Sequence, residues 1–409
     1  MTLPSNTLIL DNGAYTIKAG FPNDECLSIP NCLCRSKDGN RLFLGDEISV
    51  CKDFSSLQFK RAHEKGYVTN WSTEISLWDQ TFQRLGIQDQ KMNGHSLVLT
   101  EAPFTMPSIQ MNTTQVVFEE FEFDSLFTGL PAEFVAWNDL RSAFKEPKEW
   151  GAYKDCVLVI DSGYSFTHII PVMNGIAMEQ GIRRIDLGGR FLTNYLKEII
   201  SYRKFNMMKD FYLVNEIKEA TCFVSQNLKK DMEMGRRLRR NPLQMFYALP
   251  DYSSGRMGGV ISSTSAADAR EQQILGLCTE RFVTPELLFS PSDIGMHQSG
   301  IPETVMQSLE QFPEDLAALF LANIVLVGGN VKLPGFRTRF EAELRALAPS
   351  TAQVRSYLPK DAITFAWQGA GSMPMEFFQL GSVSRHEFAE HGMNVFRRKK
   401  MSLRLDAHK

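Results

Sequence analysis

The sequence has 409 residues, a length that predicts two to three domains. Hydrophobic residues make up 43% of the chain and charged residues 22%, close to the globular averages, which excludes a largely disordered protein. The 44 Lys and Arg residues against 47 Asp and Glu residues give a net charge of -3. This balance argues against a protein that coats nucleic acid by bulk charge.

The cysteines and the apolar segments bear on the compartment. The chain has 7 cysteines and no CxxC pair, and Cys32 and Cys34 lie too close together for the usual zinc knuckle. Residues 1–10 carry no basic region like that of a signal peptide. No run approaches the roughly 18 apolar residues that a membrane span needs. We therefore expect a soluble intracellular protein with reduced thiols and no membrane contact.

Two hairpins are predicted by one recurring pattern, in which an apolar run ends in Asp-x-Gly and a second apolar run follows. Asp11–Gly13 lies between residues 7–10 and 15–21, and Asp161–Gly163 lies between residues 156–160 and 166–170. Glycine in such a turn tolerates the positive φ that tight hairpins require. Two copies about 150 residues apart indicate an internal duplication into two similar lobes.

Strands and helices alternate after each hairpin, which predicts an α/β architecture with ligand loops at the carboxyl ends of strands. The pattern predicts strands over Ser96–Thr100 and Asn323–Val327, and helices over Gln115–Phe121, Ile185–Ile200, Leu213–Val224 and Gly335–Ala346. Trp71, Trp78 and Phe82 have roughly helical spacing, which is more typical of core packing than of a ligand platform. The Ser- and Gly-rich segment Tyr252–Glu271 predicts an exposed, mobile insertion rather than a packed element.

Three glycine-bearing turns follow strands and together suggest a phosphate site. Each turn alone is more often an ordinary turn, but Asp11–Gly13, Asp161–Gly163 and Gly328-Gly329 form an ordered set. Two facing hairpins can grip a polyphosphate, because glycine lets backbone N–H groups approach its oxygens. The two Asp carboxylates can hold a hydrated divalent cation. The third turn would let a nucleoside lie against the backbone.

These blocks resemble actin. The segments Asp11–Phe21 and Asp161–Arg190 resemble the two phosphate loops of that family, and further matching blocks extend from Leu8 to about Lys400. They include Val68–Trp71, Thr100–Pro103, Lys218-Glu219, Arg281-Phe282, Leu326–Gly329 and Ala346–Pro349. The chain is identified as a member of the actin-related proteins. The resemblance implies two α/β lobes with a nucleotide in the cleft between them, the bilobal fold that actin shares with sugar kinases and heat-shock-chaperone ATPases.

The resemblance also implies domain bounds and a set of site residues. The first lobe is expected over 1–148 plus 365–409, with a smaller subdomain at about 32–62. The second is expected over 149–364, with a peripheral subdomain at about 188–285 that carries the insertion at about 252–271. Asp11 and Asp161 would hold a metal through water. ATP or ADP with Mg would be bound, weakly or structurally, by Asp11, Asn12, Gly13, Ala14, Lys18, Asp161, Ser162, Gly163, His168, Lys218, Glu219, Gly328 and Gly329. His168 has two readings, a polar partner near the phosphates or a satisfied core histidine.

Departures from actin bear on turnover. The alignment places Pro131 where actin has a polar residue that orients the attacking water, and Glu133 is the nearest polar alternative. Proline offers neither a side-chain donor nor a backbone N–H. Tyr164 and Ser165 replace an Asp and a Gly of the second loop, Ala14 replaces a serine, and Ile363 replaces a lysine. Phosphoryl transfer depends on positioning and electrostatics, so we expect negligible hydrolysis and no enzyme activity.

Two contacts of actin filaments also look altered. The segment between Pro30 and Trp71 is a few residues shorter than in filament-forming actin, and the insertion falls at another inter-subunit contact. Filament growth needs one surface complementary to another on an identical neighbour. We therefore expect a chain that does not polymerise.

Several blocks resemble a nuclear subfamily of the actin-related proteins more than muscle-type actin. They are Leu10–Tyr15, Ile29–Cys32, Arg35–Lys37, Lys65–Trp71, Cys222–Ser225 and Arg281–Gly295. That subfamily implies a nuclear protein, with some in the cytoplasm, that acts as a scaffold in SWR/SRCAP-class remodellers, which exchange a variant histone. The implied partners are the remodeller ATPase subunit, other remodeller subunits, nucleosomal DNA and heterochromatin proteins.

Two basic clusters, Arg236–Arg240 and Arg397–Lys400, keep three readings open. Each could contact DNA, serve as a nuclear import signal or form a solvated helix face. The rival functions are an active ATPase of the same superfamily, opposed by Pro131, Tyr164 and Ala14, and a cytoskeletal filament protein, opposed by the shortened loop and the insertion.

Overall fold

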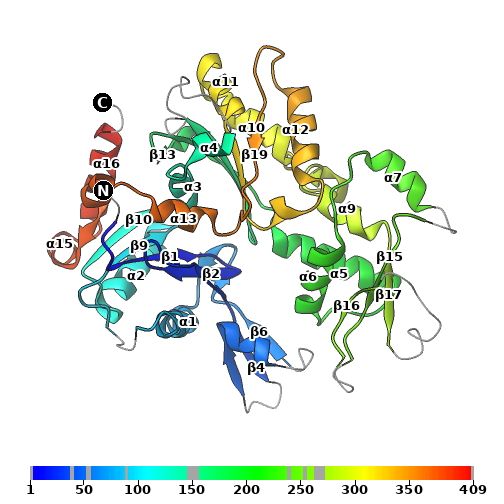
Figure 1. Cartoon of the computed structure of the whole chain (residues 1–409), viewed down its shortest axis with the longest axis horizontal. Coiled ribbons are helices and arrows are strands. Elements are labelled where there is room, and N and C mark those ends of the chain that lie inside the picture. Colours follow the sequence, from blue (N-terminus) through cyan, green and yellow to red (C-terminus); the bar gives the residue numbers. More distant parts are fainter. Residues whose placement is uncertain are drawn as a thin grey trace.

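The computed structural model describes residues 3–36, 41–51, 57–87, 91–144, 156–236, 241–251, 256–261 and 272–406. Two lobes lie side by side, each built on a six-stranded sheet (Figure 1). The first sheet has the order β20 (Val383–Ser384), β10 (Ser125–Gly129), β9 (Ser96–Thr100), β1 (Thr7–Asn12), β2 (Thr16–Gly20) and β3 (Leu27–Pro30). The second has the order β13 (Ile176–Ala177), β12 (Thr167–Met173), β11 (Val157–Ser162), β18 (Ile324–Val327) and β19 (Ser356–Tyr357), and β14 (Arg183–Ile185) also pairs with β12.

The two sheets repeat one connectivity. In each, a hairpin of antiparallel strands is followed by two parallel strands: β1–β2 then β9 and β10, and β11–β12 then β18 and β19. The register sets Asp11 opposite Lys18 in the first hairpin and Asp161 opposite His168 in the second. The predicted α/β bilobal fold is confirmed, and both Asp-x-Gly turns lie at the carboxyl ends of their strands.

Helices cover both sheets. The first lobe carries α1 (Trp71–Arg84), α2 (Pro107–Gln115), α14 (Met375–Gly381), α15 (Arg385–His391) and α16 (Asn394–Asp406). The second carries α4 (Leu140–Phe144), α5 (Gly189–Arg203), α6 (Phe211–Thr221), α7 (Leu228–Gly235), α9 (Glu280–Glu286), α10 (Ile301–Leu309), α11 (Glu314–Ala322) and α12 (Phe336–Leu347). Among the described residues, no helix has the length and apolarity to cross a membrane.

Two short helices join the lobes. The helices α3 (Pro131–Val135) and α13 (Phe365–Gly371) pack on each other at the junction seen in Figure 1. Val135 and Ala366 pack with residues of the second sheet, whereas Phe134 and Trp367 pack with residues of the first. The pair is therefore a common core element of both lobes.

Two helix predictions differ from the structure. The helix expected over Gln115–Phe121 begins earlier, at Pro107, and its last part is a π-helical turn over Val116–Glu120. The helix expected from Ile185 begins at Gly189, because Arg183–Ile185 pairs with β12 as a strand. Its first amides, those of Gly189 and Arg190, donate to the carbonyls of Gly163 and Tyr164. The second hairpin turn thus fixes where α5 starts.

Small sheets form the outer parts of the lobes. One consists of β5 (Leu42–Leu44), β4 (Leu33–Ser36) and β6 (Leu57–Lys60), and the other of β16 (Gly259–Ile261), β15 (Met245–Ala248) and β17 (Ile274–Leu277). A two-stranded ribbon joins β7 (His63–Glu64) to β8 (Tyr67–Val68). The strand β16 lies inside the predicted insertion, so the expectation that Tyr252–Glu271 holds no packed element is wrong there. The rest of that segment, except residues 256–258, and Arg237–Arg240 of the first basic cluster lie outside the described residues.

Candidate functional site

A cavity of about 660 Å³ lies between the lobes at the two hairpin turns. The predicted residues that line it are Asp11, Asn12, Gly13, Ala14, Lys18, Asp161, Gly163, His168, Lys218, Glu219, Gly328 and Gly329. Ser162 is the exception, because its buried hydroxyl contacts Thr167 and accepts a hydrogen bond from Asn330. The fold therefore brings together residues that are more than 300 positions apart in the sequence.

The two predicted carboxylates differ in their partners. Asp11 pairs with Lys18 at 3.0 Å and accepts a hydrogen bond of 2.8 Å from the Thr100 hydroxyl. Burial and the nearby Asp11 charge raise the pKa of Asp161 to about 6, although Lys18 opposes the shift. Two carboxylates from separate hairpins that both line the cavity suit a hydrated divalent cation. No cluster of three or more His, Cys, Asp or Glu side chains that could hold a metal is found in the described part of the chain.

His168 lies within the cavity wall as a neutral imidazole. Burial and the Arg184 charge lower its pKa to about 4. Its ring packs against Phe166 at 5.7 Å between centroids, and its buried Nε2 atom has no hydrogen-bond partner. A satisfied core histidine would have one, so the geometry favours the reading of His168 as a polar group for a ligand.

Lys218 is engaged inside its own lobe. Its buried ammonium donates to the Gly189 carbonyl at 3.2 Å and to Thr193 Oγ1 and Asn215 Oδ1, both at 2.9 Å. An ammonium has three donors, so these contacts occupy all of them. Lys218 therefore ties α5 to α6, and the ligand contact expected of it is not available in this conformation.

The turn glycines are also engaged. The Gly13 N–H donates to the Asp11 carbonyl at 3.0 Å, and the Gly163 N–H donates to the Phe166 carbonyl at 3.0 Å. These two amides close their hairpins and do not point to a phosphate, contrary to the expectation from the sequence.

The polar side chains near the position of the water-orienting residue bind backbone groups. Pro131 lines the cavity at the start of α3. The Glu133 carboxylate accepts the backbone N–H groups of Leu130 and Ala177 at 2.8 and 3.1 Å. Farther along the chain, the Asn138 amide donates to the carbonyls of Val135 and Phe365. Helix capping and helix packing thus occupy both polar side chains.

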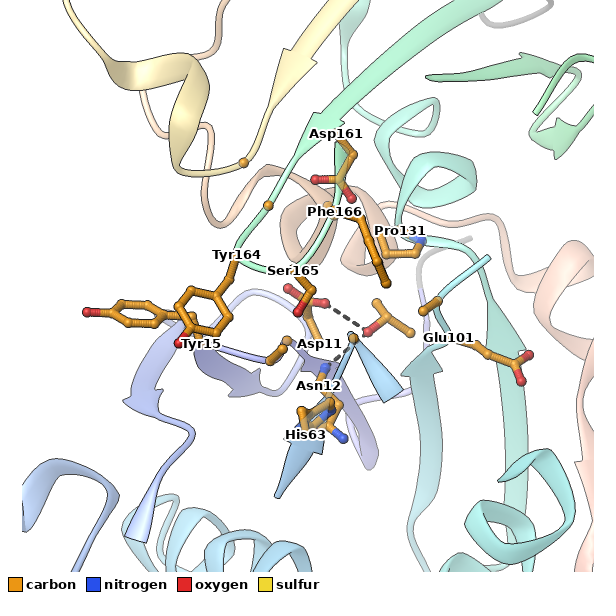
Figure 2. A pocket seen from close by; sticks show the side chains of 18 of the residues that line it. Asp11, Asn12, Tyr15, His63, Glu101, Pro131, Asp161, Tyr164, Ser165 and Phe166 are labelled. Atoms are coloured by element: carbon orange, nitrogen blue, oxygen red, sulfur yellow. Dashed lines mark hydrogen bonds between the residues drawn. The ribbon is translucent and has the colours of Figure 1, made fainter. Parts of the chain in front are cut away.

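Two large side chains that were not predicted as site residues, Tyr15 and Tyr164, also line the cavity. Figure 2 shows Tyr15 and Tyr164 together at one end, away from Asp161 and Pro131. Their ring centroids are 5.1 Å apart, and the Arg61 guanidinium lies 4.7 Å from one ring and 4.8 Å from the other. These contacts bring the two hairpin turns together at this end of the cavity. The sequence feature that could have predicted this contact is the tyrosine that follows Asp-x-Gly within two residues in each hairpin.

A buried polar cluster lies beneath the first turn. The Asn31 amide donates to the Gly13 carbonyl at 3.0 Å and to Glu74 Oε1 at 3.4 Å. Burial raises the pKa of Glu74 to about 7, even though hydrogen bonds from Asn12, Asn31 and Trp78 oppose the shift. Burial and Arg61 lower the pKa of the neighbouring His63 to about 4. Glu74 and His63 are therefore both largely uncharged between about pH 4 and pH 7.

This cluster predicts a pH-dependent stability. The folded pKa of Glu74 exceeds the value of 4.5 for a free glutamate, so the folded state binds the proton more tightly and stability falls as pH rises from about 4.5 to above 7. Glu74→Gln stays neutral and should be more stable than wild type at pH 8, by on the order of 3 kcal/mol. The gain should shrink toward zero near pH 4.

Urea unfolding midpoints at pH 5 and pH 8 measure this gain. Glu64→Gln, at an exposed position on β7, is the control and should show no such trend. Equal midpoints for Glu74→Gln and wild type at pH 8 would contradict the prediction.

Comparison with known proteins agrees with the fold. The sequence profile of the family described as Actin matches residues 2–401. The chain is 38% identical to the Actin-like protein arp6 of Aspergillus fumigatus, over 97% of this chain and 95% of that protein. It is 39% identical to Actin-related protein 6 of Drosophila melanogaster (95% and 98%) and 33% identical to Actin-related protein 6 of Arabidopsis thaliana (97% and 99%). Because the profile and these relatives cover almost the whole chain, this protein belongs to the actin family and resembles its actin-related proteins 6.

Proposed function

We propose that this protein is a non-filamentous scaffold subunit of a nuclear chromatin-remodelling complex that exchanges a variant histone. The observation that supports a scaffold is the contact between the two hairpin turns, where Tyr15, Arg61 and Tyr164 link the two lobes. The remodeller assignment rests on the resemblance of the sequence blocks to the nuclear subfamily. Bound nucleotide, ATP or ADP with Mg, would be weak or structural.

Negligible turnover is the first testable consequence. The purified chain with Mg and ATP should release no more phosphate than its Asp161→Ala variant, because Pro131 stands where the alignment places the water-orienting residue and Glu133 is engaged by backbone N–H groups. A phosphate-release assay with actin as the positive control measures this. Steady release by the wild type that Asp161→Ala abolishes would favour the rival reading as an active ATPase.

Recovery of a tagged chain from nuclear extract tests the assembly. Mass spectrometry should find a remodeller ATPase subunit and other remodeller subunits, with heterochromatin proteins as further candidates. In parallel, the chain at micromolar concentration should stay in the supernatant of a pelleting assay. Ordered filaments, or cytoskeletal proteins as the main partners, would contradict the proposal.

A DNA contact or an import signal at the second basic cluster would rest on two of its residues. Lys399 donates to the Ser382 carbonyl and pairs with Glu387 at 2.8 Å, and Lys400 lies 3.6 Å from Glu101. Arg397 and Arg398 are exposed on α16. We propose that nucleosomal DNA, if it meets this helix, contacts those two arginines.

A further inference from the structure

The contacts between the two hairpin turns come from both lobes. Tyr15 belongs to the first hairpin turn and Tyr164 to the second, and their rings are tilted by 33° at 5.1 Å. Arg61 enters from the first lobe and donates to the carbonyls of Ala14 and Asn31, at 3.3 and 3.2 Å. Its guanidinium is thereby held over both rings. Such aromatic and cation–π contacts are attractive and directional.

A hydrogen bond extends this contact to α6. The Asn215 amide donates to the Tyr15 hydroxyl oxygen at 2.9 Å and to Glu219 Oε1 at 2.8 Å. Burial raises the pKa values of the Tyr15 and Tyr164 hydroxyls, so both remain neutral near pH 7. Tyr15 therefore touches the second lobe at two points, the turn and α6.

Two neighbouring contacts continue the same seam. On the outer side, the rings of Phe59 on β6 and Tyr212 on α6 stack at 5.4 Å with an interplanar angle of 10°. On the inner side, Arg184 donates to the Tyr67 hydroxyl at 3.2 Å. These side-chain contacts link the lobes along the cleft, in addition to the junction that α3 and α13 form.

We infer that Tyr15, Arg61, Tyr164 and Asn215 form a clasp that holds the lobes closed without nucleotide and limits the entry of a polyphosphate. This inference goes beyond the proposed scaffold role, because it says that side-chain contacts, and not a bound nucleotide, keep the lobes closed. If a ligand binds only when the clasp is open, its apparent affinity is its intrinsic affinity multiplied by the fraction of molecules that are open. Weakening the clasp should thus speed nucleotide entry and loosen both faces of the cleft.

The double variant Tyr15→Ala with Tyr164→Ala tests the clasp in the full-length chain. Amide hydrogen exchange without nucleotide should rise at least tenfold in β4, β6 and α6. Association of a fluorescent ATP analogue with Mg should be at least tenfold faster than for wild type. Tyr202→Ala, at a tyrosine that is 92% exposed on α5, is the matched control and should behave as wild type.

A second variant separates the clasp from general damage to the fold. Tyr15→Phe keeps the ring and removes only the acceptor of the Asn215 hydrogen bond, so it should raise exchange in α6 about threefold at an unchanged melting temperature. The inference is overturned if both variants stay within twofold of wild type in exchange and association. It is also overturned if ATP strongly protects β4, β6 and α6 of the wild type, since the lobes would then be open without ligand. If no chain binds the analogue, hydrogen exchange decides alone.

Discussion

Gly369→Ala is expected to destabilise the protein by about 3 kcal/mol, because a backbone would have to move to accept one methyl group. A Cβ atom at Gly369 would lie 1.9 Å from the Phe134 carbonyl oxygen and 2.6 Å from the Asn138 amide. Gly369 is therefore the residue that lets α13 approach α3. Since these helices belong to the cores of both lobes, the steric strain in the variant acts at the junction between the lobes.

Gly371→Ala, in the same helix, is the matched control. Its Cβ would meet only Ile9 Cδ1, at 3.4 Å, and alanine favours a helix over glycine by up to about 1 kcal/mol. Its urea unfolding midpoint should equal that of wild type or rise slightly, whereas that of Gly369→Ala should fall clearly. Similar midpoints for the two variants would show that the close approach of α3 and α13 does not limit stability.

The elements that could be predicted from the sequence are those that a short stretch of residues specifies. Asp11–Gly13 and Asp161–Gly163 each combine a strand, a tight turn and a return strand within about 15 residues, and both hairpins form as predicted. Their repetition also predicted two related lobes facing each other. The order of the strands then brings Gly328 near the second turn, where a Cβ would lie 2.3 Å from the Ser162 carbonyl oxygen.

The parts that could not be predicted depend on long-range contacts. Arg61 contacts Tyr15, which is 46 positions away in the sequence, and Tyr164, which belongs to the other lobe. No local sequence pattern predicts such contacts. The same holds for Glu133, which the alignment offered as the nearest polar alternative for the water-orienting residue. Its carboxylate instead accepts N–H groups that the fold leaves unpaired at Leu130 and Ala177. Lys218 was expected to contact a ligand, but its ammonium is buried. A buried donor needs a hydrogen-bond partner, and here the partners come from α5 and α6.

Trp78→Ala is expected to cost about 3–5 kcal/mol of unfolding free energy, the range for a buried large aromatic side chain. Trp78 is fully buried, as its spacing predicted, and packs on Phe82 and Phe121. Its indole N–H also donates to Asn12 Oδ1 at 3.2 Å, so the variant should loosen the first turn and speed its amide exchange.

Two conservative variants separate packing from the hydrogen bond. Trp78→Phe keeps most of the packing but removes the indole donor, so that Asn12 Oδ1 keeps only the 3.5 Å hydrogen bond from Asn31, a loss of about 1–2 kcal/mol. In Trp137, by contrast, the buried Nε1 atom has no hydrogen-bond partner, and its ring packs on Phe377 at 5.0 Å. Because Trp137→Phe removes an unpaired donor, it should cost less than Trp78→Phe in urea unfolding and leave exchange at Asn12 and Gly13 unchanged. If Trp137→Phe lost more unfolding free energy than Trp78→Phe, the loss of ring volume, and not the loss of the hydrogen bond to Asn12, would explain the effect of the Trp78 variant.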